Sequence, residues 1–285
     1  MWDRRPLQRP RCGLWVASLA AGVLGMAVTA TLGGDAAPAT TTPAPAAKAT
    51  TKPTTRRFGR YVPNVHDAPA QREGGGTRQC NAEPGLYVLA LAPANVVGKT
   101  TRQQPTLLWY ISRPTNSEVE ITITALEAPA GAAGQSKGKL VGDWRLKHGV
   151  TLAGIQKLDL AAGADARGQQ VHLDRAVTYE WGVEVLVRPG GEDAADDPSS
   201  VVKLQPVAPP PAVARAASSG DPEELTQAYL DDGIWCDALS SITALLENAP
   251  GDPNLLEVRR KMLADAGYVE DADGHIEDGG KPAGK

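Results

Sequence analysis

Gly98-Lys99-Thr100 has the residue types that end a phosphate-binding loop. In such a loop, glycine amides and a lysine hold phosphate oxygens at the start of a helix. Here Pro93 stands where the first glycine is needed, and Pro105 interrupts the chain before a helix can form. Without a helix N-terminus the anion site is lost. We therefore predict no nucleotide site and no cofactor.

A second candidate is the acidic stretch from Val269 to Gly280. It contains Asp271, Asp273 and Gly274 in the order found in the middle of an EF-hand calcium loop. The first and last ligand positions hold Val269 and Gly280, and losing those two carboxylates removes most of the cage. We expect a solvated acidic tail with an Asp-Gly turn, and we predict no metal site.

One further cluster of carboxylates leaves an enzymatic alternative open. An envelope hydrolase or carbohydrate-active enzyme could use the acidic run of Glu192, Asp193, Asp196 and Asp197 if it lined a deep pocket. A solvated loop is the simpler interpretation. The four histidines have no metal-ligand spacing, and the sequence contains no Gly-x-Ser-x-Gly motif. No catalytic residue is predicted.

Two cysteines could do redox chemistry. Of the three in the chain, Cys12 precedes an apolar segment that we expect to direct export. In an oxidising compartment Cys80 and Cys236 could form a disulfide. Cys236 is also well placed as a small apolar residue inside a helical hairpin, so both interpretations stay open.

The elements that would position these groups are organised around residues 229–250. The pattern of one tetratricopeptide repeat is a helix, a tight glycine turn, a second helix and a proline. That spacing is matched by Tyr229, Gly233, Trp235, Ala238, Ile242 and Pro250. A third helix over residues 254–266 is expected to close the unit, with Gly267 as its cap.

Such a hairpin cannot stand alone, because arrays of this kind need about three repeats to bury a core. Its apolar stripe therefore needs a cover, either from the rest of the chain or from a partner protein. The residues that would pack the hairpin or bind the partner are Tyr229, Trp235, Leu239 and Ile242.

Strands are predicted before the hairpin. Val119, Ile121 and Ile123 alternate with polar residues, and residues 179–187 repeat this period of two. Such alternation is typical of a sheet that has one face exposed to solvent. Several short strands between residues 86 and 207 predict an antiparallel Ig-like β-sandwich. The predicted fold class is α+β: this sandwich, followed by a small tetratricopeptide-like helical hairpin, with an N-terminal signal or anchor helix.

Composition predicts the domain boundaries. Arginines followed by the charge-free residues 12–32 are typical of a secretory signal or a single-pass anchor. The predicted order is a signal or anchor (1–34), a disordered Ala/Thr/Pro-rich tether (35–76), the β-sandwich (77–207), a Pro/Ala/Ser linker (208–220), the helical hairpin with its capping helix (221–268), and a disordered acidic tail (269–285).

Several motifs follow one another in a set order. They are Gly74-Gly75-Gly76-Thr77-Arg78 with Cys80, Leu89-Ala90-Leu91-Ala92-Pro93, Trp109-Tyr110, Tyr179-x-Trp181, Asp197-Pro198-x-Ser200, and Gly233-Ile234-Trp235-x-Asp237-Ala238-Leu239. Together they resemble the bacterial domain-of-unknown-function family numbered 928, from about Gly74 to Gly267. The resemblance implies an exported protein with no established activity, and it transfers no catalytic residue.

Two departures from that family bear on the disulfide. The family tends to have a tyrosine where Cys236 stands, and a cysteine near a strand end where this chain has Arg188-Pro189. A disulfide usual for the family would therefore lack its second half.

The balance of charged residues argues against one class of binding partner. A balance of 29 Lys+Arg against 33 Asp+Glu argues against a general nucleic-acid binder, which would have a basic face. We expect an exported protein of the periplasm or cell envelope that is non-catalytic and binds an unknown envelope protein as a partner or scaffold. Membrane contact is expected only through residues 12–32, if that segment is not cleaved.

Overall fold

The computed structural model describes residues 57–62, 83–93, 96–126, 138–175, 177–187 and 197–279. These residues contain ten strands and four helices, which confirms the α+β class, and all of them lie in one compact unit, Thr54–Lys285. Among them, no helix is both long and apolar enough to cross a bilayer. The predicted signal or anchor segment (1–34) lies outside the described residues.

An inner sheet lies at the centre of this unit. It contains β1 (Val88–Ala90), β3 (Thr106–Ile111) and β6 (Gly154–Asp159) in the order β1-β3-β6, all antiparallel. Leu107 and Trp109 of β3 belong to one hydrophobic core, and Leu108 and Tyr110 to another. Because successive side chains of a strand point to opposite faces, the sheet is covered on both sides. This double burial explains the continuous apolar run in β3.

An outer sheet covers one face of the inner sheet. Its order is β2 (Gly98–Thr100), β8 (Ser199–Pro206), β7 (Tyr179–Leu186), β4 (Glu118–Ala125) and β5 (Lys139–Leu146). Val119, Ile121 and Ile123 point into the core shared with the inner sheet, as their alternation predicts. The two sheets pack face to face. The predicted wholly antiparallel arrangement is wrong at one place, because β2 runs parallel to β8.

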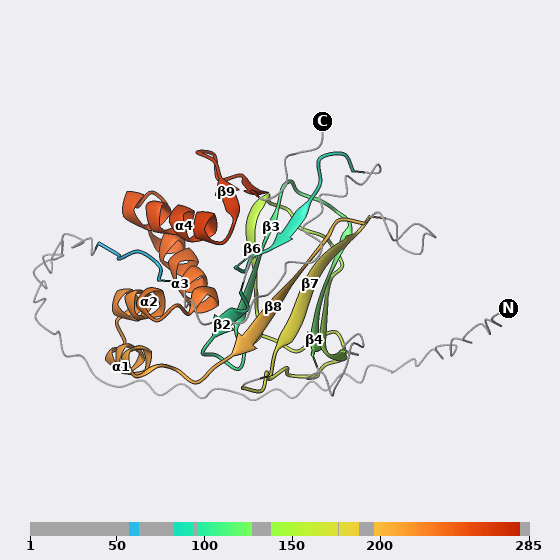
Figure 1. Ribbon diagram of the computed structural model, residues 1–285. Helices are drawn as coiled ribbons and strands as arrows, with labels where there is room; N and C mark the ends of the chain where they lie inside the picture. The colour runs from blue at the N-terminus through green and yellow to red at the C-terminus, as the bar shows by residue number, and fades with distance from the viewer. Residues whose placement is uncertain are drawn as a thin grey trace, which may run out of the picture. The chain divides into compact units, whose positions relative to one another are not determined.

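A helical layer covers the other face of the inner sheet (Figure 1). It contains α1 (Pro211–Ser219), α2 (Pro222–Asp231), α3 (Trp235–Asn248) and α4 (Pro253–Asp265). The carboxylates of Asp221 and Asp252 accept amide hydrogen bonds at the starts of α2 and α4. The turn between α2 and α3 places Gly233 at a φ of 69°, a conformation that favours glycine.

The helical layer is larger than the sequence predicts. Residues 208–220, predicted as a linker, contain α1. Its alanines favour a helix, and Pro211 at its first position costs no hydrogen bond. Val213 and Ala216, three positions apart, face the helical core. This core anchors α1.

The predicted acidic tail also contains structure. β9 (Tyr268–Glu270) and β10 (Ile276–Asp278) form an antiparallel hairpin. Tyr268 and Ile276 are fully buried, and the Tyr268 hydroxyl donates to the carbonyl of Ala90 at 2.7 Å. Two apolar side chains at the right spacing therefore fold a stretch that is otherwise acidic.

One part of the predicted tether is ordered as well. Residues 57–62, which we call the strap, run without regular secondary structure against α2 and α4 and are blue in Figure 1. Tyr61 is buried in the helical core, and Phe58 packs against the same core. The other residues of the tether lie outside the described part of the chain.

Candidate functional site

The side chains predicted to pack the hairpin or bind a partner are all buried in the core shared by the helical layer and the inner sheet. Their exposed fractions are at most 4%: Tyr229, Trp235, Leu239 and Ile242. In this fold they pack against neighbours and form no open surface. The cover that the hairpin needs is the inner sheet, through Leu89, Leu91, Leu108 and Tyr110.

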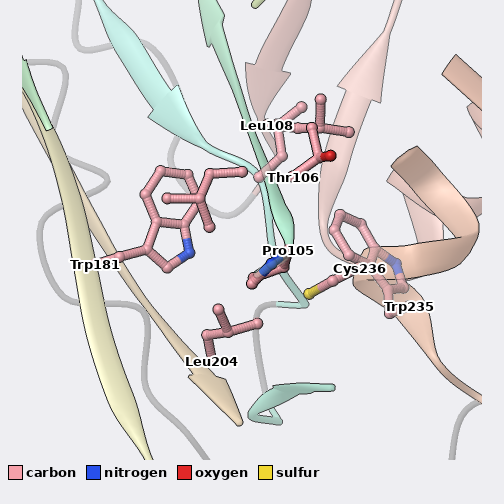
Figure 2. A pocket seen from close by; sticks show the side chains of 9 residues that line it. Pro105, Thr106, Leu108, Trp181, Leu204, Trp235 and Cys236 are labelled. Carbon is pink, nitrogen blue, oxygen red and sulfur yellow. The ribbon is translucent and has the colours of Figure 1, made fainter. Parts of the chain in front are cut away.

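The start of α3 lies where the helical layer meets both sheets (Figure 2). Trp235 and Cys236 of α3 lie across a small cavity from Trp181 and Leu204 of the outer sheet, with Pro105 between them. The cavity holds only about 10 Å³, which is room for a single water at most. It is a packing gap rather than a ligand site.

Asp237, in the first turn of α3, is the polar centre of this junction. Its side chain is buried, and its two carboxylate oxygens accept hydrogen bonds from the Thr100 hydroxyl (2.6 Å), the Thr101 amide (2.7 Å) and the Thr101 hydroxyl (2.6 Å). An acid at this position also suits the partial positive charge of a helix N-terminus. The sequence motif contains Asp237, but its spacing does not reveal partners that lie 136 and 137 residues away.

The same contact explains the sequence that looks like a phosphate loop. Gly98 lies in β2, and a Cβ atom there would come within 2.8 Å of the Cys236 sulfur. Thr100 and Thr101 are engaged by Asp237. The glycine and threonines therefore form the surface on which α3 docks, and no helix N-terminus follows them.

The redox prediction can be placed only in part. Cys236 has no disulfide partner among the described residues, and Cys80 lies outside them, so the disulfide stays a prediction. Burial raises the pKa of the Cys236 thiol, and the neighbouring Asp237 carboxylate adds to the rise. Little thiolate, the reactive form, exists at neutral pH.

The predicted acidic candidates make structural contacts. The Asp271 carboxylate accepts from the amides of Asp273 and His275 and so shapes the turn between β9 and β10. Asp197 is buried and accepts from the Val187 amide; Glu192, Asp193 and Asp196 lie outside the described residues. Within the described ranges, no group of three or more His, Cys, Asp or Glu could hold a metal ion.

The strap marks a different kind of site, a place where the helical layer holds a piece of polypeptide without regular secondary structure. Its Gly59 amide donates to the Gln227 side chain at 2.7 Å, and its Val62 amide donates to the Leu230 carbonyl at 3.1 Å. Arg60 pairs with Asp265 of α4 at 3.1 Å. A hollow of about 150 Å³ remains between the strap and α4. We call the surface that holds the strap the α2–α4 groove. It consists of Gln227 and Leu230 of α2, and of Asp265 and the hollow-lining Asn254, Glu257, Val258 and Lys261 of α4. This groove is the candidate binding site.

The sequence prediction missed the groove because the strap lies in a region that is poor in apolar residues. The only available signal was Phe58 and Tyr61, two aromatic side chains three positions apart. These two side chains have a fixed place because they pack against the helical core. Local composition does not predict that packing.

Comparison with solved structures includes three low-scoring similarities to enzymes. They are a β-glucosidase from Streptomyces venezuelae, DesR (16% identity, 42% of this chain and 15% of that chain, TM-score 0.21), a β-glucosidase from Listeria innocua (11%, 52% and 20%, TM-score 0.20) and a β-D-glucoside glucohydrolase from Trichoderma reesei (14%, 42% and 18%, TM-score 0.16). The matched part covers at most a fifth of those enzymes, and such scores do not support the enzymatic alternative. No curated protein matches the chain.

The family comparison is much stronger. A family model described as Domain of Unknown Function (DUF928) matches residues 73–274. Motif residues make contacts between elements: the Ser200 hydroxyl of β8 accepts from the Ala90 amide of β1 at 2.9 Å, and Asp237 joins α3 to Thr100. The chain belongs to the family Domain of Unknown Function (DUF928).

Proposed function

We propose that the protein is an exported, non-catalytic protein-binding or scaffold module of the bacterial cell envelope, and that it binds its partner through the α2–α4 groove. The observation that carries the proposal is the strap, because the helical layer already binds an irregular segment there with main-chain, aromatic and charged contacts. When a protein binds a peptide by strand addition, main-chain hydrogen bonds give affinity and pockets for side chains give specificity.

The proposal includes an interpretation of the fold. Two face-to-face sheets that share a core support a relationship to Ig-like sandwiches, here with one parallel strand pair. The α2–α3 pair, joined at Gly233, supports a tetratricopeptide-like unit that the inner sheet covers in place of neighbouring repeats. In this arrangement the sheets hold the helices, and the helices present the groove.

Affinity capture from native envelope extracts tests the function. The bait is the full chain, either wild type or with Gln227→Ala and Asp265→Lys, which remove the acceptor for Gly59 and reverse the charge that holds Arg60. We expect at least one envelope protein to be enriched with the wild type and at least fivefold less with the groove variant. Asp174→Lys, on an exposed loop, is the matched charge control and should capture normally. Equal capture by all baits, or no enrichment, would exclude the groove as the partner site.

Cell fractionation with N-terminal sequencing tests the export part of the proposal. The protein is expected outside the cytoplasm, either cleaved near Ala30 or retained through residues 12–32. Finding it in the cytoplasm with an intact N-terminus would contradict this part.

A further inference from the structure

Strand β6 has one side that no strand occupies within the described ranges. The inner sheet has the order β1-β3-β6, so β6 pairs only with β3. The other three edge strands each contact a neighbour: β2 lies against α3, β5 accepts a hydrogen bond from the Ala166 amide, and β1 donates to the Ser200 hydroxyl of β8. An unpaired strand edge is a ready template for a further strand.

The register of β6 shows which main-chain groups face this open side. The Leu160 amide, one position after the strand, donates to the Pro105 carbonyl at 3.2 Å. In an antiparallel pair every second residue faces the neighbour, so the even-numbered residues of β6 direct their amides and carbonyls toward β3. Ile155, Lys157 and Asp159 direct theirs outward. A second antiparallel strand can bond here only where its own outward-facing residues lie opposite these three.

The charges on the outward-facing residues select one register for pairing with a second copy of β6. Lys157 and Asp159 are both exposed, and their side chains lie on the same face of the strand. With a two-fold axis at Leu158, each Lys157 lies opposite Asp159 of the second copy. An axis at Lys157 or at Asp159 would place like charges directly opposite each other, which is destabilising. An axis at Gln156 would place Lys157 opposite Ile155 and leave it without an opposite charge.

The surroundings of these residues favour the same register. A lysine on a strand edge normally discourages pairing, but the Lys157 ammonium already lies 2.6 Å from the Glu247 carboxylate of α3, which offsets its charge. One carboxylate oxygen of Asp159 accepts from the Ala161 amide at 3.0 Å, which holds this acid beside the edge. Leu158 lies on the opposite face and packs against the core shared by the two sheets, so apolar side chains would meet at the axis.

We infer that the protein forms a homodimer through β6, in which the inner sheets of two copies join into one antiparallel sheet. Lys157 and Asp159 form main-chain hydrogen bonds and ion pairs with Asp159 and Lys157 of the second copy, so the same patch serves on both sides of the two-fold axis. The paired stretch is short, and the dimer is therefore reversible and depends on protein concentration. This inference goes beyond the proposed function and does not depend on the α2–α4 groove.

Charge reversal tests the register, with the full chain in mild detergent and sedimentation equilibrium over a wide range of protein concentrations. We expect the wild type to reach the mass of a dimer. Lys157→Asp and Asp159→Lys should each weaken dimerisation at least tenfold, because each creates two pairs of like charges at the interface. The two substitutions combined restore opposite charges in both pairs and should return most of the affinity. Lys147→Asp, at an exposed position just after β5, is the matched control and should dimerise like the wild type.

Three outcomes would overturn the dimer. One is a wild-type chain that stays monomeric at every concentration. A second is a dimer that neither single reversal weakens, since the copies would then meet through another surface. The third is a combined variant that dimerises no better than the single variants. Circular dichroism should give all variants the unfolding temperature of the wild type, because Lys157 and Asp159 are exposed.

Discussion

Asp237 is a buried carboxylate whose role is to join two layers. Burying a charge is costly unless hydrogen bonds replace its hydration, and here two threonines supply three donors. The donors come from β2 and the residue after it, whereas the carboxylate comes from α3. The arrangement fixes the register of the helical layer against the outer sheet.

The first prediction concerns this carboxylate. Asp237→Ala should lower the free energy of unfolding by about 2–3 kcal/mol, because it leaves buried donors of Thr100 and Thr101 without an acceptor. Chemical denaturation of the purified protein measures the change. Asp273→Ala, at an exposed position in the β9–β10 turn, should change it by less than about 0.5 kcal/mol. Equal effects of the two substitutions would contradict the structural role of Asp237.

A second prediction concerns the thiol of Cys236. Its raised pKa keeps it protonated, so the native protein should alkylate at this position far more slowly than the denatured protein throughout pH 7–9. Peptide mapping by mass spectrometry after iodoacetamide treatment measures the rate. A fast reaction in the native state, or a peptide in which Cys236 is bridged to Cys80, would show that Cys236 is not the protonated, partly buried thiol described above.

At the residue scale, sequence predicts apolar roles better than polar ones. The apolar stripe through Trp235, Leu239 and Ile242 follows from helical spacing, because the period of a helix is local information. The partners of Asp237 lie in another element, and which element that is depends on how the layers pack. In the sequence Gly98 and Thr100 therefore look like part of a phosphate-binding loop, whereas in the fold they contact α3.

At the element scale, α1 provides the clearest test. Val213 is 2% exposed, although the composition of residues 208–220 predicts a linker there. Val213→Ser should lower the unfolding free energy by about 1–3 kcal/mol, because it removes buried apolar surface and buries a hydroxyl. Ala217→Ser, on the exposed side of the same helix, is the matched control and should be nearly neutral. No difference between the two variants in thermal unfolding would mean that α1 does not pack as described.

Elements were predictable where a repeating pattern was long. The alternation in β4 and β7 and the helical stripe in α3 each extend over several residues, and these elements form close to the predicted places. Short elements such as β2, β9 and β10 have three residues each, too few for a period to be recognised. They form because a larger neighbour offers hydrogen bonds or burial.

At the scale of the whole molecule, the inner sheet holds the described unit together. Its two faces belong to two hydrophobic cores, one shared with the outer sheet and one shared with the helical layer. The helices cannot leave without exposing Leu89, Leu91 and Leu108, so we expect layers this closely linked to unfold together. A linked base of this kind would keep the α2–α4 groove in place for the partner that we propose.

The most direct test of this account is the effect of Trp235→Ala on unfolding, measured by scanning calorimetry together with amide hydrogen exchange. Truncating a buried tryptophan typically costs about 3–5 kcal/mol. We predict a cooperative transition at a clearly lower temperature, with faster exchange in α3 and in β3 alike, while Leu152→Ala, at a position 72% exposed, leaves both unchanged. A helical layer that melts in its own separate transition, with exchange in β3 unaffected, would contradict the claim that the inner sheet and the helices form one structural unit.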